Sequence, residues 1–591
     1  MLKKVSSYFM TMLFNVLKRF PIASLMLFLS FAAVVSANHF FGYSNRSTIL
    51  RVSLQAFTAF PLMVAIQIFC ENHIYKKQLF YKVILSFSAI GFTVLYFFYF
   101  FTKSDRIDLI RCFSLFIIFT ATAMILLSYK NKYFSVNLIK LSVNFFLSFL
   151  YSNVLMLGLI GFFLITRTLL FPKLDRDIIQ DIIAFSTVIF APMFFMAGIP
   201  DRNSNNDELK YPMILKFIIK YLAIPFSFCY MGILYLYFAK SLISLSIPKG
   251  VIVHIVIWFS IGCFVVLAYI SALLKESKSA ALYNKIVPKL LIPVLLFMFY
   301  SLYLRVSDYG FTESRYFILI TGLFLLGVMI YASFTKNIKW KAVFLALIIF
   351  TFISAFSPLN AFKVSISSQN RRFEEILKRN GMIVNGKVKP SDKISEEDKS
   401  ELSSIFKYFN YSHSLKELKL FPQNLNSEDY VKIFGFNINY YYSGAKTDSS
   451  IYLSYQNSDR NNFIVDSSEC DFIILFDYLY NSNDLTVENK KHRAVLSSDR
   501  KIVSIYTKSD NSLIYSFDIN KAVGQKLKEN RAAGSSKYLV PADALLYTDI
   551  TKSGISVKYI FNNISGTYYP QTDKYDNVDF SGVFIQVKLS R

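Results

Sequence analysis

The first 360 residues alternate long apolar runs with short polar segments, and this pattern predicts a bundle of membrane-spanning helices. A helix needs about 20 mainly apolar residues to cross the hydrocarbon layer of a bilayer. Eleven runs reach or approach that length, at residues 20–41, 52–70, 83–101, 109–129, 141–170, 182–199, 221–239, 251–274, 290–304, 317–334 and 342–357. The fifth run is longer than a bilayer requires, which indicates tilt or extension into water, and the ninth is the shortest.

After residue 360 the apolar positions become periodic, which is typical of a soluble domain. Spacing of three and four residues predicts helices at 369–380, 396–409, 427–434 and 521–530, with Ser395 as an N-cap and Gly381 as a stop. Strict alternation predicts strands at 438–442, 451–455, 472–478, 502–506, 513–517, 557–561 and 583–589. The fold class expected is a polytopic α-helical membrane bundle of about eleven helices, followed by a soluble α+β domain with helices to about residue 435 and mainly strands beyond.

Composition separates the same two parts of the chain. Its 591 residues are 54% apolar with a mean hydropathy of +0.40, which is too apolar for a soluble protein of this length. Residues 1–360 hold 33 Lys and Arg against 12 Asp and Glu, whereas residues 361–591 hold 31 against 27. The basic excess therefore belongs to the loops between apolar runs, where positive charge sets orientation, and nucleic acid is not an expected partner.

The distribution of those basic residues predicts which way the bundle faces. With the N-terminus in the cytoplasm, the cytoplasmic segments hold 21 of the 33 basic residues and the opposite loops hold 12. The positive-inside rule favours that orientation, and eleven spans then place the C-terminus outside. We therefore expect a cytoplasmic amphipathic N-terminus at residues 1–19, a transmembrane domain at 20–360 and an extracytoplasmic domain at 361–591.

A polar island, RVSDYGFTESRY at residues 305–316, lies between the ninth and tenth runs. Asp-Tyr-Gly has the composition of a turn, and a threonine followed by a glutamate predicts that a new helix begins at Glu313. Two functions fit the island: a loop that anchors helices at the headgroup layer, or a site for a substrate or a lipid headgroup. We expect the arginines to pair with the acids or to lie at the headgroups, with both tyrosines as interfacial anchors. The candidate functional or anchoring residues are Arg305, Asp308, Tyr309, Gly310, Thr312, Glu313, Arg315 and Tyr316.

Residues that could carry catalysis or bind a metal are scattered. The five cysteines and five histidines show no metal-ligand spacing, and residues 361–591 contain one cysteine, Cys470, so no disulfide within that part is expected. Asp466, Glu469 and Asp471 offer a candidate carboxylate pair, although scattered surface acids are commoner. We expect no catalytic residue, cofactor or metal.

Several segments resemble a known bacterial family. Residues 224–237 (IPFSFCYMGILYLY), 247–250 (IPKG) and 308–316 (DYGFTESRY) resemble the membrane proteins grouped as domain of unknown function 4153. Residues 367–377 (SSQNRRFEEIL) and 381–386 are similar to the segment after the last span in its longer members. The resemblance covers about residues 214–386 and implies an integral protein of a bacterial envelope. It supplies no activity, substrate or catalytic residue.

Three classes of function follow. The first is a non-enzymatic envelope protein of the bacterial cytoplasmic membrane, whose bundle anchors an extracytoplasmic binding or sensing domain. Its expected partners are the bilayer and a small-molecule, lipid or envelope-protein ligand. The second is a transporter or lipid-handling protein, which the scarcity of ionisable residues inside the runs disfavours. The third is a membrane-embedded glycosyltransferase, for which Asp105 and Asp108 in an outside loop are the available acids.

Overall fold

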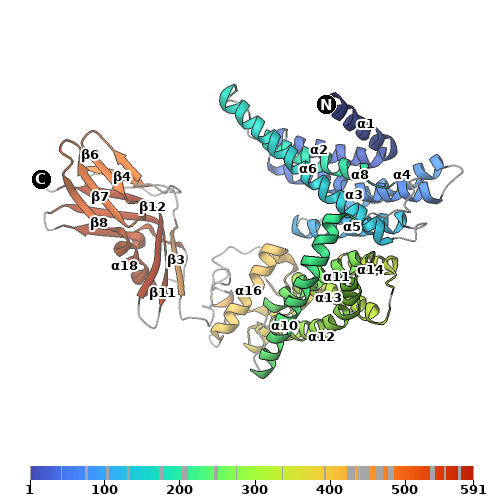
Figure 1. The fold of residues 1–591 in the computed structure, drawn as a ribbon. Helices are drawn as coiled ribbons and strands as arrows, with labels where there is room; N and C mark the ends of the chain where they lie inside the picture. Colours follow the sequence, from blue (N-terminus) through green and yellow to red (C-terminus); the bar gives the residue numbers. More distant parts are fainter. Residues whose placement is uncertain are drawn as a thin grey trace. The chain divides into compact units, whose positions relative to one another are not determined.

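The chain forms two compact units, Met1–Arg372 and Phe373–Arg591, and each is described by itself. The computed structural model describes residues 2–40, 43–73, 78–100, 105–128, 134–171, 175, 177–200, 211–244, 251–274, 276–335, 337–391, 394–421, 433–436, 438, 451–458, 470–476, 485–532, 539–551, 554–569 and 574–589. The first unit is helical and the second contains β-sheets (Figure 1).

Helices account for nearly all of the described part of the first unit. In chain order they are α1 (Leu2–Arg19), α2 (Pro21–His39), α3 (Tyr43–His73), α4 (Gln78–Phe100), α5 (Asp105–Leu127), α6 (Phe134–Leu169), α7 (Ile178–Ala184), η1 (Phe185–Phe190), α8 (Ala191–Ala197), α9 (Met213–Phe217), η2 (Ile218–Ala223), α10 (Ile224–Ile243), α11 (Val251–Ile270), α12 (Lys278–Tyr309), α13 (Glu313–Phe334), α14 (Trp340–Phe356) and α15 (Ala361–Arg379). Two of these, η1 and η2, are π-helical turns that join neighbouring α-helices. Each of the eleven predicted runs overlaps one of these helical segments.

Nine helices among the described residues are long and apolar enough to cross a membrane, and a tenth is reached if α14 and α15, bent by 45°, form one span. The remaining predicted run lies on α4. Its apolar stretch, Phe80–Tyr96, is shorter than the nine helices that could cross a membrane. The predicted fold class is therefore confirmed, with the helix count approximate. The ninth run, predicted at 290–304, is the middle of the 32-residue helix α12, which starts after the Ser277 cap.

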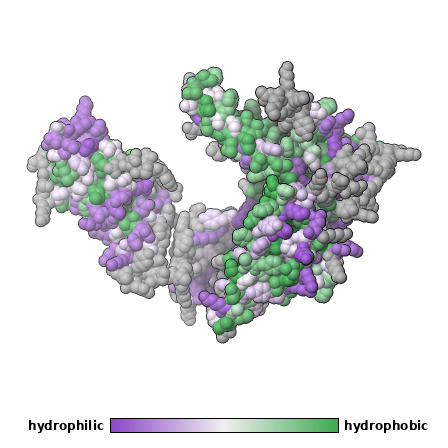
Figure 2. All heavy atoms as spheres, in the orientation of Figure 1, coloured by the Kyte–Doolittle hydropathy of each residue, from purple (hydrophilic) through white to green (hydrophobic). Residues whose placement is uncertain are grey.

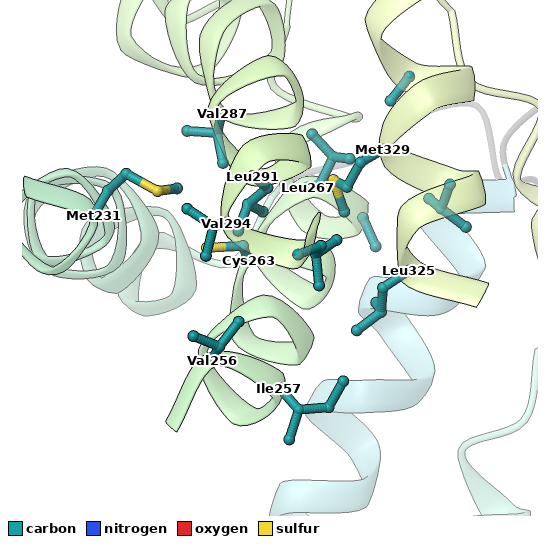
Figure 3. Close-up of a cluster of buried hydrophobic side chains, with 14 of the residues drawn as sticks. Met231, Val256, Ile257, Cys263, Leu267, Val287, Leu291, Val294, Leu325 and Met329 are labelled. Carbon is teal, nitrogen blue, oxygen red and sulfur yellow. The ribbon is translucent and has the colours of Figure 1, made fainter. Parts of the chain in front are cut away.

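Three hydrophobic clusters are found among the described residues of the helical unit. One is built mainly from α1, α2, α3 and α8, the second surrounds α12, and a smaller third joins α4 and α5. In the second cluster Val294 and Leu291 of α12 lie between Met231 of α10, Cys263 of α11 and Met329 of α13 (Figure 3). Outside the clusters, large apolar side chains remain at the surface of this unit, and they are the kind of surface that a bilayer covers (Figure 2).

Two prolines lie inside α12, at Pro288 and Pro293. A proline in a helix lacks the N–H that would bond to the carbonyl four residues earlier, and its ring opens the turn. In the turn before Pro293, the carbonyl of Leu290 accepts a hydrogen bond from the Tyr235 hydroxyl of α10 at 2.8 Å. The carbonyl that Pro293 deprives of its helical donor is that of Lys289, one residue before Leu290, so the Tyr235 hydroxyl supports this weakened turn rather than replacing the missing bond.

The second unit begins with the end of α15 and a small helical region. It contains the hairpin β1 (Ile383–Val384) and β2 (Lys387–Val388), then α16 (Glu396–Ser412) and η3 (Leu415–Glu417). The helix predicted at 396–409 and its Ser395 cap are confirmed, because the Ser395 side chain accepts from the N–H of Asp398. Gly381, at φ +65°, follows the end of α15 as the stop signal predicted. The predicted helix at 427–434 and strand at 438–442 fall largely outside the described residues.

Two antiparallel sheets and one helix make the rest of this unit. The elements are β3 (Ile451–Asn457), β4 (Phe472–Phe476), β5 (Leu485–Glu488), β6 (His492–Leu496), β7 (Ile502–Thr507), β8 (Leu513–Asp518), α18 (Ile519–Ala532), β9 (Leu539–Val540), η4 (Ala542–Leu545), β10 (Leu546–Ile550), β11 (Ser556–Tyr569) and β12 (Lys574–Lys588). One sheet has the order β4-β12-β11-β3-β9, with β10 also paired to β11, and only its β3–β9 pair is parallel among the described strands. The other sheet is the meander β5-β6-β7-β8.

Side chains from both sheets and from α18 share one hydrophobic core. Gly566 of β11 lets α18 approach, because a Cβ there would lie 2.8 Å from a methyl carbon of Leu527. Within the core the Tyr559 hydroxyl donates to that of Tyr515 at 2.9 Å, and Tyr515 donates to the Asp549 carboxylate at 2.8 Å. Burial raises the pKa of both tyrosines above the usual value for a phenol.

Candidate functional site at the α12–α13 turn

The predicted island forms the end of α12, a short turn and the start of α13. Arg305, Asp308 and Tyr309 lie in the last turns of α12, which ends at Tyr309 with Gly310 as its C-cap. Glu313, Arg315 and Tyr316 lie in the first turn of α13, which begins at Glu313 as predicted. The predicted turn at Asp308–Gly310 is wrong in one detail: the helix continues through Tyr309, and the turn is residues 310–312.

The helix reaches Tyr309 because side chains from elsewhere satisfy its last carbonyls. Nη1 of Arg315 donates to the carbonyls of Tyr309 at 2.9 Å and Gly310 at 2.6 Å. The Gln369 amide of α15 donates to the carbonyls of Tyr309 at 3.1 Å and Phe311 at 2.8 Å. A helix end leaves such carbonyls without partners in the helix, so these donors allow it to extend.

Gly310 is required by conformation and by space. Its φ of +65° is left-handed, and a Cβ at this position would lie 3.0 Å from both the Ser368 hydroxyl and the Gln369 amide nitrogen. The Ser368 hydroxyl also accepts the N–H of Phe311 at 2.9 Å. The first half of α15 is therefore hydrogen-bonded to the turn, and the missing Cβ permits this contact.

Aromatic and cationic side chains gather beside the turn. The guanidinium carbon of Arg315 lies 5.7 Å from the centre of the Tyr309 ring, and that of Arg372 lies 5.5 Å from the same centre. Both distances fall within the range of cation–π attraction. Tyr309 is 47% exposed, whereas Tyr316 is 6% exposed and its hydroxyl donates to the carbonyl of Leu359. Tyr316 is thus a packing residue rather than the interfacial anchor expected.

The expected pairing of the arginines with acids is not found. Among the described residues, neither Arg305 nor Arg315 forms an ion pair with a carboxylate, while Asp308 and Glu313 each have an interaction of their own. Thr312 occupies the N-cap position of α13 in an extended conformation, but within the described structure its side chain makes no capping hydrogen bond. The charge of Arg315 is held by backbone carbonyls and an aromatic ring instead.

Sequence reasoning missed the partners of the island on α15. Ser368, Gln369 and Arg372 all contact the turn, and they lie in the segment SSQNRRFEEIL that resembled the family pattern. The two segments were recognised separately, but nothing in their spacing indicates that they meet. The available signal is a small hydroxyl next to an amide, Ser368 and Gln369, near the middle of the amphipathic helix α15, because both side chains can bond to exposed backbone groups.

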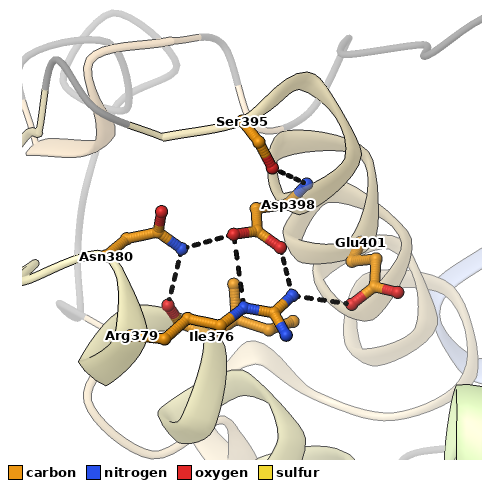
Figure 4. Close-up of polar contacts among 6 residues, drawn as sticks. All are labelled: Ile376, Arg379, Asn380, Ser395, Asp398 and Glu401. Carbon is orange, nitrogen blue, oxygen red and sulfur yellow. Dashed lines mark hydrogen bonds and ion pairs between the residues drawn. The ribbon is translucent and has the colours of Figure 1, made fainter.

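A second polar network lies in the other unit and joins the end of α15 to α16 (Figure 4). The Asp398 carboxylate, 8% exposed as a residue, accepts from Nε of Arg379 at 3.2 Å, from Nη2 of Arg379, and from the amide of Asn380 at 2.6 Å. The hydrogen bond to Asp398 raises the pKa of Arg379. Glu401 adds a longer contact to Arg379 at 3.5 Å. This network has a structural role, because the Asp398 carboxylate already accepts hydrogen bonds from other residues of the chain.

The acids considered for catalysis are also engaged in structural contacts or lie outside the described residues. Asp471 accepts the N–H of Leu589 at 2.7 Å, and Asp466 and Glu469 fall outside the described part of the chain. Asp108 is 2% exposed and pairs with Arg51 at 3.7 Å. The described residues contain no group of three or more His, Cys, Asp or Glu side chains arranged to hold a metal ion.

The long apolar helices and the separate sheets define a multi-pass helical membrane protein with a β-sheet-rich C-terminal domain. The chain belongs to the family described as Domain of unknown function (DUF4153), which matches residues 23–377, more than half of its length. The predicted resemblance is therefore confirmed, and it extends further towards the N-terminus than expected.

The chain is also similar to a curated protein whose name carries no function. The chain is 24% identical over 205 residues to the protein named "Uncharacterized protein PM1469" from Pasteurella multocida (strain Pm70). The match covers 34% of this chain and 35% of the relative, so the chain spans about a third of that relative's length. No solved structure matches the chain. These comparisons establish the family and leave the activity to be argued from the molecule itself.

Proposed function

We propose that this protein is a non-enzymatic component of a bacterial envelope, in which the helical bundle anchors an extracytoplasmic domain that binds or senses a ligand. The observation that carries the proposal is the hydrophobic core that the described residues of the two sheets and α18 share. A segment that only connects or decorates a bundle needs no core of its own, whereas a binding module needs a rigid frame.

Binding is favoured over catalysis by how the acids are used. The Asp398 carboxylate is filled by Arg379 and Asn380, Asp471 caps a backbone N–H, and Asp108 pairs with Arg51. A catalytic acid or base must be able to reach a proton of the substrate. Carboxylates engaged in this way stabilise the fold.

The orientation in this proposal rests on the basic residues of the loops. Counted over the eleven predicted runs, 21 basic residues lie on the N-terminal side and 12 on the other, which favours a cytoplasmic N-terminus. An odd number of spans then puts the sheet domain outside the cytoplasmic membrane. A cytoplasm-specific reporter fused after Arg591 is then inactive, and the same reporter fused after Lys278 is active. The opposite pair of results places the sheet domain in the cytoplasm and excludes an extracytoplasmic role.

Ligand binding is tested separately, on full-length protein extracted in mild detergent. Mass spectrometry of the intact protein and of its co-purifying small molecules identifies a ligand. Truncation after residue 450 removes the two large sheets and α18 but leaves helices α1 to α16, so it serves as the matched control. A molecule retained by the full chain and lost from the truncated chain supports the proposal. Equal retention by both proteins assigns binding to the helices and contradicts it.

A further inference from the structure

At the turn between α12 and α13, positively charged side chains gather beside one aromatic ring. Arg315 and Arg372 both lie within 6 Å of the Tyr309 ring centre, at 5.7 and 5.5 Å. Arg305 precedes Tyr309 by four residues on α12, so the two project from the same helix face. Three guanidiniums that come from three helices therefore converge on a single turn.

At two of these three arginines, no ion pair with a carboxylate of the described residues neutralises the positive charge. In the described structure Arg305 and Arg315 have no carboxylate within ion-pair distance, although Asp308 and Glu313 belong to the same segment. Arg315 uses Nη1 on two backbone carbonyls, which fixes its guanidinium plane. Like charges held close together raise the free energy of the site, and an anion between them would lower it.

The surroundings place the site at the depth of lipid headgroups. A turn of three residues connects two helices that are each long and apolar enough to span a bilayer, so it must lie at a membrane face. Tyr300 and Tyr303, one to three turns before the site on α12, are 50% and 66% exposed. Exposed tyrosines near a helix end are typical of the layer where hydrocarbon meets headgroups.

We propose that Arg305, Arg315 and Arg372 bind a phosphate group at the membrane surface, with Tyr309 holding two of the guanidiniums in place. Guanidinium groups suit phosphate because their parallel N–H donors match its oxygens. The phosphate belongs either to an anionic phospholipid or to a soluble phosphate compound. The site is separate from the sheet domain, so it extends the protein's function beyond the role proposed above.

The test uses full-length protein in nanodiscs and native mass spectrometry of the bound lipids. Arg305→Gln is the main variant, because its side chain makes no hydrogen bond or ion pair within the described structure that the change would remove. Arg315→Lys keeps the charge but loses the planar fork. Lys339→Gln is the matched control, since it removes one exposed positive charge at the start of α14, beyond the C-terminal end of α13. Each variant is checked for its amount in the membrane and its unfolding midpoint.

The source of the phosphate is decided by two titrations. In one, phosphatidylglycerol is raised against phosphatidylcholine, and in the other inorganic phosphate is added to protein in uncharged detergent. We expect Arg305→Gln and Arg315→Lys to lower the apparent affinity by roughly tenfold in one titration, while Lys339→Gln changes neither. An effect in the first titration identifies a lipid, and an effect in the second a soluble compound. Folded variants that match the control in both titrations overturn the proposal.

Discussion

The backbone conformation and the limited space at position 310 both require glycine. Its φ of +65° disfavours any side chain, and the space where a Cβ would lie is taken by Ser368 and Gln369 of α15. A residue that violates either requirement alone lowers the free energy of unfolding by about 1–2 kcal/mol. Both act together here, because the contact with α15 prevents the turn from relaxing to another conformation.

Gly310→Val should therefore lower the stability of the full-length protein by more than about 2 kcal/mol, through left-handed strain and collision with α15. Thermal unfolding in detergent and the amount of protein in the membrane measure the loss. Gly327→Ala is the control, because Gly327 lies within α13 and a Cβ there meets no atom within 4 Å. A Gly310→Val protein as stable as the Gly327→Ala protein would show that α15 does not rest on this turn.

Residue identities predicted the local geometry of the turn better than its contacts. Gly310, Glu313 and the change of helix follow from short-range rules of turns and caps. The hydrogen bonds of the turn to Ser368 and Gln369, and that of Tyr316 to Leu359, join residues that are 43 to 60 positions apart in the chain. No local rule contains that information, since pairing between distant helices is decided by the shape of the packed bundle.

At the scale of elements, Asp398 joins two helices that the sequence predicted separately. Ser395 and Asp398 stand in N-cap and N3 positions, where a capping box would direct the acid back to the cap's own N–H. Asp398 instead bonds to Arg379 and Asn380 at the end of α15. The residue that starts one helix thereby fixes the end of another.

Asp398→Asn should release that junction, because a neutral amide cannot accept the same set of charged donors. We expect a loss of about 2 kcal/mol, visible as hydrogen exchange of α16 amides that is at least about tenfold faster in full-length protein. Glu401→Gln removes a longer, more exposed contact to the same arginine and should change the exchange little. If the two substitutions accelerate exchange equally, the negative charge near Arg379, rather than the buried hydrogen bonds of Asp398, stabilises the junction.

Strand prediction succeeded where alternation was uninterrupted and failed where charged residues broke it. The strands at 451–455, 502–506 and 513–517 correspond closely to β3, β7 and β8. β5 and β6 were missed because Glu488, Lys490 and Lys491 crowd their shared turn and mask the pattern on both sides. β10 was missed because it is a short strand directly after η4 and pairs with only part of β11.

At the scale of the whole molecule, the division into two units falls within α15. Residues 361–372 belong to the helical unit, where Ser368 and Gln369 bond to the α12–α13 turn. Phe373, Ile376 and Leu377, each at most 1% exposed, belong to the second unit. One continuous helix thus contributes its first half and its second half to different hydrophobic environments.

Residues 361–591 expressed alone should unfold cooperatively, because their core is complete within that range. The transition should not depend on a reducing agent, since Cys470 has no cysteine partner in the fragment. The amides of residues 361–368 should exchange rapidly in the fragment and slowly in the full chain, because the turn they contact has been removed. A broad, non-cooperative transition would indicate that the sheet domain requires the bundle to fold.

Tyr235 relates the proline turn of α12 to the order in which the protein is synthesised. The hydroxyl of Tyr235 bonds to the carbonyl of Leu290, in the turn that Pro293 opens. Pro293 removes one helical hydrogen bond from this turn, and the Tyr235 hydroxyl adds a hydrogen bond to it, so α12 is most stable beside α10. Because α10 comes earlier in the chain, its hydroxyl is already in the membrane when α12 leaves the translocation channel. The order of helices along the chain is thus also the order in which the bundle's hydrogen-bond donors become available during biogenesis.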